Sequence, residues 1–200
     1  MELVVATTNK NKLREIKAIL KDLGLNLRIT SLNNYPKAPR IIENGKSFKE
    51  NAIKKAIKIA SFTQKLTLGE DSGLEVEALG SKPGIYSSRF AGKDKNDLKN
   101  NLKLLKLLKD LPLNKRNAEY VCAVALADKD GLIKVAEGRC RGLIGFEQKG
   151  RFGFGYDPLF IIPKYKKTFA QLGPHVKHKM SHRYRALKKI RNTILQFLVR

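Results

Sequence analysis

The sequence predicts an α/β fold in which helices flank a mixed β-sheet. Two observations carry this prediction: strands and helices alternate in the first half of the chain, and a long β-hairpin pattern dominates the middle. Alternation is typical of parallel strands joined by helices, whereas a hairpin adds antiparallel strands. We therefore expect one sheet that contains both kinds of pairing.

The first elements follow from hydrophobic spacing and from turn residues. Residues 2–7, ELVVAT, form a short apolar run that predicts a buried strand, and apolar residues then recur at helical spacing over residues 9–20. Residues 33–46 contain prolines that interrupt regular structure and predict a long loop. Ser47 and Glu50 match a capping box, which predicts a helix that begins there and carries Lys55 on its polar face.

The remaining elements complete the mixed sheet. KLTLGEDSGLEVEALG predicts a strand, an acidic turn and an alternating strand, and AEYVCAVALAD and LIKVAEGRCRGLIG flank KDG as a hairpin. A helix over residues 94–111 should begin at Asp94, and a last helix should begin at Ser181 after a loop region. The expected buried stripe of the helix over residues 94–111 consists of leucines: Leu98, Leu102, Leu105 and Leu108.

Composition limits the classes of protein that the chain can form. Its 200 residues suffice for one domain with two lobes, and the 42% hydrophobic and 30% charged residues exclude disordered and fibrous classes. Neither an apolar membrane span nor a signal-peptide pattern is present, so we expect a cytoplasmic location. Cys122 and Cys140 lack metal or disulfide spacing and should be small buried residues.

The net charge is the extreme feature of the composition. Forty-one Lys and Arg against 18 Asp and Glu give +23, which attracts polyanions such as nucleic acids and nucleotides. Most lysines fall on the outer faces of amphipathic helices, where a solvated surface is the first interpretation and a nucleic-acid surface the alternative.

Two turns could carry chemistry. TTNKNK lies between a strand and a helix N-terminus, where free N–H groups and the helix dipole favour an anion, although a plain capped helix is the alternative. In GEDSG, the neighbouring carboxylates of Glu70 and Asp71 suit Mg²⁺, with Glu43 as a third acid if the preceding loop folds back. The alternative is a turn with two solvated acids. Together, a phosphate-binding turn and a metal-binding pair of acids are the groups that an enzyme needs to hydrolyse a phosphoanhydride bond.

Two stretches in the last quarter of the chain could hold a flat ligand. GFGYDPLF is either a ring-rich turn or a slot for such a ligand, and His182 and Arg183 at a helix N-terminus are placed as donors to a carbonyl-bearing ring. A basic surface patch is the alternative for the second stretch. The three histidines have no ligand pattern that would favour zinc.

The chain resembles the inosine triphosphate pyrophosphatases, also called XTP/dITP diphosphatases. The resemblance covers nearly the whole chain and rests on VVATTNKNKLREI, ENGKSFKENAIKKA, EDSGLEVEALGSKPGIYSSRFAG, GFGYDPLF, KTFAQL and KHKMSHRYRAL, in order. It implies an elongated two-lobed fold over residues 1–200 with a central cleft, a homodimer, and Mg²⁺-dependent hydrolysis of ITP, dITP or XTP to the monophosphate and pyrophosphate.

Carried over to this chain, the resemblance also implies a set of site residues. Asp71 would be the general base, and Glu43 and Asp71 would lie near Mg²⁺. The phosphates would contact Thr7, Thr8, Asn9, Lys10, Asn11, Lys12 and Lys55. The nucleoside and base would contact Ser72, Phe154, Gly155, Tyr156, Asp157, Lys177, His182 and Arg183.

Some positions depart from the family pattern, and two rival functions remain. Glu70 stands where an aspartate is common and keeps the charge, whereas Arg141, Gln171 and Val176 each stand where a glutamate is common, which contributes to the high net charge. A nucleic-acid-binding protein would use the basic surface and the aromatic rings, but it would not need the acidic turn. Maf-like nucleotide pyrophosphatases share the reaction and prefer other bases, so a panel of nucleoside triphosphates would separate them.

Overall fold

The computed structural model describes residues 2–198 and divides the chain into two compact units. Unit 1 comprises the described parts of Met1–Asp71, Cys122–Gly138 and His182–Arg200, and unit 2 comprises Ser72–Val121 and Arg139–Ser181. Three long strands pass from one unit into the other: β3 (Thr67–Val76), β5 (Asn117–Asp128) and β6 (Gly131–Ile144). That residues 1–200 form a single two-lobed domain stays a prediction.

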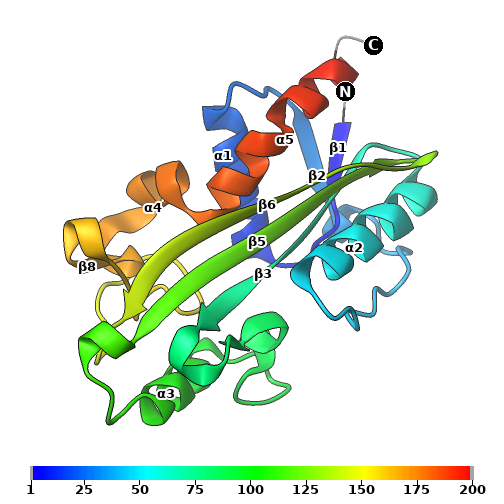
Figure 1. The fold of residues 1–200 in the computed structure, drawn as a ribbon. Coiled ribbons are helices and arrows are strands. Elements are labelled where there is room, and N and C mark those ends of the chain that lie inside the picture. The colour runs from blue at the N-terminus through cyan, green and yellow to red at the C-terminus, as the bar shows by residue number, and fades with distance from the viewer. Residues whose placement is uncertain (1, 199–200) are drawn as a thin grey trace. The chain divides into compact units, whose positions relative to one another are not determined.

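Each unit adds its own elements to these three strands (Figure 1). Those of unit 1 are β1 (Glu2–Val5), α1 (Lys10–Asp22), β2 (Arg28–Ser31), the 3₁₀ segment η1 (Leu32–Asn34), α2 (Phe48–Thr63) and α5 (His182–Leu198). Those of unit 2 are η2 (Glu77–Leu79), β4 (Lys82–Pro83), η3 (Gly84–Arg89), α3 (Asp97–Leu107), η4 (Leu113–Lys115), β7 (Phe160–Ile162), η5 (Pro163–Tyr165), β8 (Lys167–Thr168) and α4 (Phe169–Met180).

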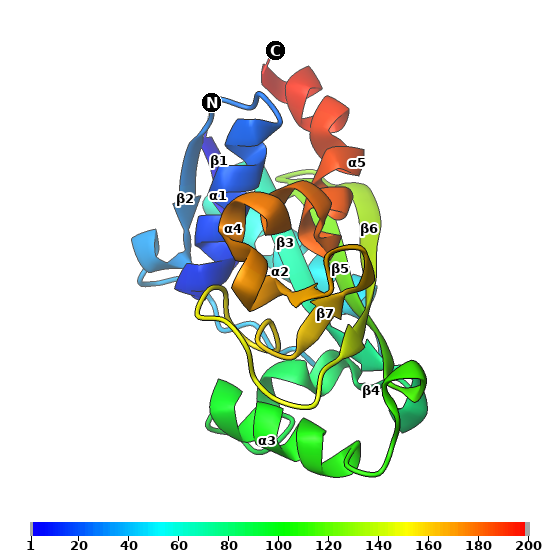
Figure 2. The same cartoon turned by 90° about the vertical axis from the view of Figure 1, so that its left-hand side faces the viewer.

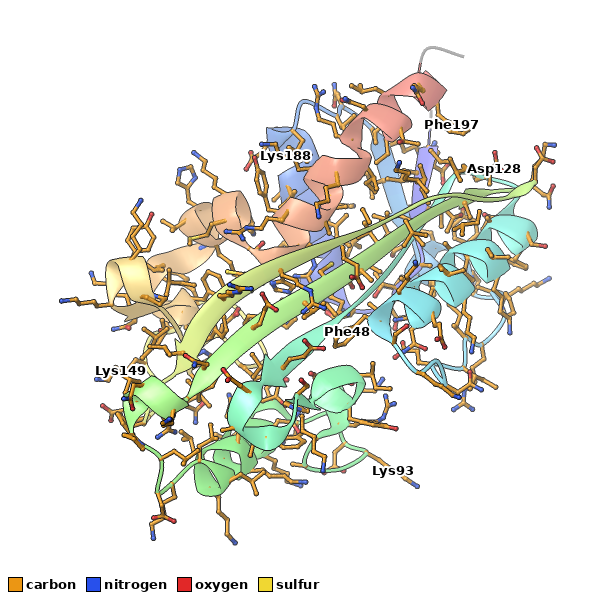
Figure 3. All side chains as sticks on the ribbon, in the orientation of Figure 1. Phe48, Lys93, Asp128, Lys149, Lys188 and Phe197 are labelled. Atoms are coloured by element: carbon orange, nitrogen blue, oxygen red, sulfur yellow. The ribbon has the colours of Figure 1, made fainter. Side chains whose placement is uncertain are left out.

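The predicted mixed sheet with flanking helices is confirmed. The strand order is β2-β1-β3-β5-β6-β7-β8, and β4 pairs with β3. In unit 1, β1 runs parallel to both β2 and β3, whereas in unit 2 the pairs β3–β4, β6–β7 and β7–β8 are antiparallel. The predicted hairpin is also present, because β5 ends at Asp128 beside the two-residue turn that leads into β6 (Figure 3).

In unit 1, β1 has helices on both of its faces. Leu3 and Val5 pack in the core cluster that contains residues of α1 and α5, whereas Val4 packs with Ile59 of α2. Figure 1 shows α1 and α5 side by side and α2 across the strands from them. The backbone of α2 comes so close to β3 that a Cβ at Gly69 would lie 2.1 Å from the Ala52 carbonyl oxygen.

The core of unit 2 is rich in aromatic rings. Phe160 of β7 lies with its ring centroid 4.6 Å from that of Tyr120 and 5.3 Å from that of Phe169. Phe169 is the first residue of α4, which lies beside β7 (Figure 2). The expected loop in this region is wrong, because Thr168 and Gln171 form a capping box that starts α4, and the helix continues past a kink at Gly173.

The buried stripe predicted for the helix over residues 94–111 is only partly right, because Leu108, just past the end of α3, is buried and Leu105 packs against the same core. The helix begins after Asn96, whose side chain caps it, and Leu98 and Leu102 are more than half exposed. Asn100 and Asn101 turn inward instead, because their amides bond backbone groups of neighbouring loops. Within residues 2–198, no helix is long and apolar enough to cross a membrane. The cytoplasmic location stays a prediction.

Candidate active site

The acidic segment GEDSG is part of strand β3, so the predicted turn is wrong. The strand continues from Thr67 to Val76, and its successive side chains point to opposite faces of the sheet. Glu70 therefore faces α1 and α5, and Asp71 faces α2. The sequence favoured a turn because Gly and Asp are poor strand formers, but partners on both faces outweigh that local preference.

Glu70 lies in a buried cluster of balanced charges, here called the Glu70 cluster. Its Oε2 lies 2.9 Å from Lys12 Nζ, and its Oε1 accepts a 2.9 Å hydrogen bond from Arg183 Nη2. Arg183 Nη1 donates to Glu15, so this guanidinium binds two carboxylates. The thiol of Cys122 lies 3.4 Å from Glu70 Oε1 and completes the cluster.

The charges of the Glu70 cluster hold one another ionised. Burial alone would raise the pKa of Glu70, but Lys12 and Arg183 outweigh it and lower that pKa well below the ordinary value. Burial would lower the pKa of Arg183, which Glu70 and Glu15 raise instead. The pKa of Cys122 is raised well above the ordinary value, by burial and by the charge on Glu70, so its thiol stays protonated. The four charged side chains therefore neutralise one another, while that of Lys12 stays partly exposed.

Asp71 lies in a second group, here called the Asp71 cluster. Lys55 Nζ lies 3.0 Å from Asp71 Oδ1, and Asn51 Nδ2 donates a 3.0 Å hydrogen bond to Asp71 Oδ2. Glu43 Oε1 also lies 3.0 Å from Lys55 Nζ. The loop before α2 therefore does fold back, as the metal hypothesis required, and it brings Glu43 to the same ammonium group as Asp71.

Lys55, which the sequence places on the polar face of α2, is buried. Its ammonium group contacts Asp71, Glu43 and the backbone oxygen of Glu70. Burial alone would lower the pKa of Lys55, but the carboxylates, Asp71 first among them, raise it above the ordinary value. The ammonium group therefore stays positively charged and offsets part of the negative charge of Asp71 and Glu43.

The N-terminal turn precedes α1 and is capped by its own side chains. Asn9 Oδ1 accepts from the N–H groups of Asn11 and Lys12, and Thr7 Oγ1 accepts from the N–H of Asn9. Asn11 is half-buried. Thr8, Asn9 and Lys10 are exposed. The capped-helix interpretation therefore holds for this structure, while the exposed side chains and the helix dipole remain suited to an anion.

In unit 2, Asp157 organises the stretch GFGYDP. It is buried, accepts from the N–H of Phe154, and lies 2.5 Å from Lys177 Nζ through Oδ2. Lys177 Nζ also lies 4.9 Å from the centroid of the Phe154 ring, a cation–π distance. Tyr120 donates a 3.3 Å hydrogen bond to Asp157 Oδ1. The structure thus brings Phe154, Asp157 and Lys177 together, and their contact with a base stays a prediction.

The other predicted residues of unit 2 have mixed surroundings. Gly155 N–H donates to Asp97 at 2.7 Å, which fixes the turn, and Ser72 is half-buried at the start of this unit's part of β3. Tyr156 is buried in the core, and its hydroxyl donates to the Ser87 carbonyl oxygen. Burial and the charge on Asp97 raise the pKa of Tyr156 above its ordinary value.

His182 and Arg183 lie in unit 1, where they open α5 as predicted, and both are buried. The two terminal nitrogens of Arg183 face carboxylates. A role for this pair in reading a base stays a prediction.

Sequence reasoning missed two site residues, Glu15 and Asn51. Each is a polar residue on the apolar face of a helix, Glu15 beside buried Ile16 and Asn51 beside buried Ala52. That position was a usable signal, because a buried polar group requires a partner. Both residues have one here, in Arg183 and Asp71.

The Asp71 cluster fits a magnesium ion. Two carboxylates from different elements converge on one cation, and Mg²⁺ in enzymes is commonly held by one or two carboxylates together with substrate phosphates. Within residues 2–198, no three or more His, Cys, Asp or Glu side chains form a group that could hold a metal ion by themselves. The donor set is therefore suited to an ion that arrives with a ligand, and it is not suited to a structural zinc site.

A mixed sheet that holds a carboxylate–lysine cluster and an anion-favouring helix N-terminus within one unit is an arrangement suited to enzymes that act on phosphorylated substrates. The comparisons with known proteins give the family. The profile of the Ham1 family matches residues 3–193, and this chain belongs to that family.

Its relatives match over nearly their whole length. The chain is 49% identical over 189 residues to a dITP/XTP pyrophosphatase of Desulforamulus reducens, covering 94% of this chain and 93% of that protein. It is 46% identical to a dITP/XTP pyrophosphatase of Shouchella clausii, covering 96% of each. Among solved structures, a HAM1 protein from Coxiella burnetii matches with a TM-score of 0.86 and 36% identity, over 98% of this chain and 99% of that one. The Staphylococcus aureus Ham1 protein gives 0.85 and 36%, over 98% and 100%.

Proposed function

We propose that this chain hydrolyses the non-canonical purine nucleoside triphosphates ITP, dITP and XTP to the monophosphate and pyrophosphate. Such a reaction keeps deaminated purines out of DNA and RNA. The observation that carries the proposal is the Asp71 cluster, in which a carboxylate is held between an amide and a lysine beside a second carboxylate. The names of the relatives, dITP/XTP pyrophosphatases, support the substrate class.

In this mechanism, Asp71 is the general base. Its Oδ2 accepts a hydrogen bond from the Asn51 amide, and its Oδ1 lies 3.0 Å from the Lys55 ammonium. The carboxylate takes a proton from a water molecule whose oxygen bonds to the α-phosphorus. The bond from that phosphorus to the bridging oxygen breaks, and pyrophosphate leaves with the electron pair.

Glu43 and Asp71 would hold Mg²⁺. When bound, the ion neutralises the charge that develops on the phosphate oxygens. The chain's own contribution is to bring the two carboxylates to one place and to keep Lys55 charged between them. Glu43 could act as an exchangeable ligand of the ion, because its side chain is 42% exposed whereas that of Asp71 is 9% exposed.

We assign the triphosphate to unit 1. The exposed side chains at the start of α1 are available donors, and the ammonium of Lys12 is partly exposed while it contacts Glu70. Lys55 supplies a further cation, and the set comprises Thr7, Thr8, Asn9, Lys10, Asn11, Lys12 and Lys55. Cations of this kind stabilise the departing pyrophosphate.

We assign purine recognition chiefly to unit 2. The half-buried ring of Phe154 offers a stacking surface, and Asp157 and Lys177 hold the turn that presents it. His182 and Arg183, together with Ser72, Gly155 and Tyr156, complete the proposed set. The O6 of hypoxanthine and xanthine accepts hydrogen bonds, whereas adenine carries a donor amino group there, so a donor in the site would disfavour ATP.

The direct test is a panel of nucleoside triphosphates with Mg²⁺, scored separately for pyrophosphate and orthophosphate. We expect pyrophosphate from ITP, dITP and XTP and slow turnover of ATP. Release of orthophosphate, or turnover of ATP as fast as ITP, would contradict the proposal. The same panel separates it from a Maf-like preference for other bases, and omission of Mg²⁺ tests the metal. The predicted homodimer is part of the proposal and is checked by sedimentation equilibrium.

A further inference from the structure

The loop before α2 contains one buried point of attachment. Residues 42–44 and 46 are exposed, but Gly45 is buried, and its N–H donates a 2.8 Å hydrogen bond to Asn51 Oδ1. The same amide donates through Nδ2 to Asp71 Oδ2 at 3.0 Å. Asn51 therefore joins the loop that carries Glu43 to the carboxylate of Asp71.

The orientation of the Asn51 amide is determined from both sides. A backbone N–H can only donate, so the atom facing Gly45 must be the oxygen. The amino group then faces Asp71, which as a carboxylate only accepts. A Cβ at Gly45 would lie 2.7 Å from Asn51 Oδ1, so glycine is required at this close approach.

Lys55 of α2 also contacts both sides, because its Nζ lies 3.0 Å from Glu43 Oε1 and 3.0 Å from Asp71 Oδ1. Three further contacts between this loop and α2 are of a different kind. Glu50 accepts from Lys46 N–H, Lys54 donates to Asn44, and Lys58 donates to the Arg40 carbonyl oxygen, all at exposed positions. Such exposed contacts hold the loop but reach no acid of the Asp71 cluster. Asn51 is 2% exposed and bonds both the loop, at Gly45, and the carboxylate of Asp71.

We propose that Asn51 is a positioning residue that couples the Glu43 loop to Asp71. The hydrogen bond from Gly45 N–H to Asn51 Oδ1 orients the amide so that its Nδ2 donates to Asp71 Oδ2. That hydrogen bond fixes the rotation of the carboxylate, so that Oδ1 is presented beside Lys55 and Glu43. The consequence for turnover rests on the proposed function, whereas the orientation itself does not.

Two variants separate the halves of this bridge. Asn51→Asp is isosteric, keeps an acceptor for Gly45 and replaces the donor to Asp71 by an oxygen. Gly45→Ala displaces the loop and leaves the donor in place. The matched control is Asn100→Asp, because Asn100 is a buried amide that also accepts from a backbone N–H, that of Ala91, and donates to a carbonyl oxygen. Lys54→Met removes an exposed contact of the same loop as a second control.

We expect kcat for ITP to fall about 10- to 100-fold in Asn51→Asp, as for other residues that orient a metal-binding carboxylate, with the Gly45 amide still protected from hydrogen exchange. In Gly45→Ala we expect KM to rise and cleavage of residues 35–47 by protease to accelerate. The carboxyl-carbon NMR signal of Asp71, recorded without metal or nucleotide, should shift in both variants and stay unchanged in the two controls.

Wild-type kcat in Asn51→Asp would overturn the proposal. So would an unshifted Asp71 signal in both variants, or an equal loss of kcat per folded molecule in Asn100→Asp. If the unaltered protein releases no pyrophosphate from ITP, the proposed function fails, and the Asp71 signal then decides the positioning role by itself.

Discussion

The two acids of β3 are adjacent in sequence and have opposite surroundings. Glu70 is fully buried among Lys12, Arg183 and other charges that neutralise it, and its pKa is held far down. Asp71 contacts the Asn51 amide and the Lys55 ammonium, which also contacts the exposed loop acid Glu43. A strand separates neighbouring side chains onto two faces, so one acid can serve the fold while the next serves the chemistry.

The largest expected effect is on turnover, from a change at Asp71. Asp71→Asn should lower turnover of ITP about 100- to 10,000-fold, the usual contribution of a general base, because an amide cannot take the proton from water. Binding of ITP should persist. The melting temperature should fall, because an Asn side chain has one oxygen, so either Asn51 Nδ2 or Lys55 Nζ would face its amino group. Equilibrium dialysis with ITP and a pyrophosphate assay measure the two properties, and retained turnover would place the base elsewhere.

The next largest effect is on stability, from a change at Glu70. Glu70→Gln should lower the free energy of unfolding by about 3–5 kcal/mol, because Lys12 and Arg183 would lose a buried partner. Urea denaturation of both proteins measures the difference. A loss below about 1 kcal/mol, the range of exposed ion pairs, would contradict the structural role.

A smaller effect is expected at Glu43, the exposed member of the Asp71 cluster. Glu43→Gln should raise the Mg²⁺ concentration needed for half-maximal activity, because an amide is a weaker ligand for a hard cation. Its stability cost should stay within about 1 kcal/mol, because the Glu43 side chain is 42% exposed. Titration of activity with Mg²⁺ checks this prediction, and an unchanged curve would remove Glu43 from the metal site.

The smallest effect concerns a third acid of the unit 1 sheet. Glu2 accepts from the Thr30 hydroxyl and from Lys65, and these donors lower the pKa of Glu2 from 4.5 to about 2. Because the pKa of Glu2 is lower in the folded protein than in the unfolded chain, ionised Glu2 stabilises the fold at pH values above the unfolded-state pKa. That stabilisation is lost as the pH falls toward 2. The stability difference between wild type and Glu2→Gln should therefore shrink between pH 4.5 and 2 in thermal melts. A constant difference would contradict it.

The sequence predicted features that depend on local order. The mixed sheet, the hairpin, the capped starts of α1 and α2, and the burial of both cysteines are confirmed. The loop with Glu43 folds back, which was the condition that the metal hypothesis set, and the metal itself stays a prediction. Only three-dimensional packing could show Lys55 between Glu43 and Asp71.

Failures occurred where tertiary partners outweighed local preference. GEDSG was predicted as a turn because its residues are poor strand formers, yet each acid found cations on its own face. Leu98 and Leu102 were predicted to be buried by spacing, but Asn100 and Asn101 took the inner face to bond loop backbone. Periodicity counts apolar residues and cannot register such hydrogen-bond demands.

The central claim is that Glu70 and Asp71 have separate roles. The most direct test is the turnover of ITP per folded molecule in Glu70→Gln, with the folded fraction taken from its denaturation curve, beside that of Asp71→Asn. We predict that Glu70→Gln stays within about tenfold of wild type, a change of about 1.4 kcal/mol in activation free energy, while Asp71→Asn falls far below it. A loss in Glu70→Gln as deep as that in Asp71→Asn would contradict the division of roles.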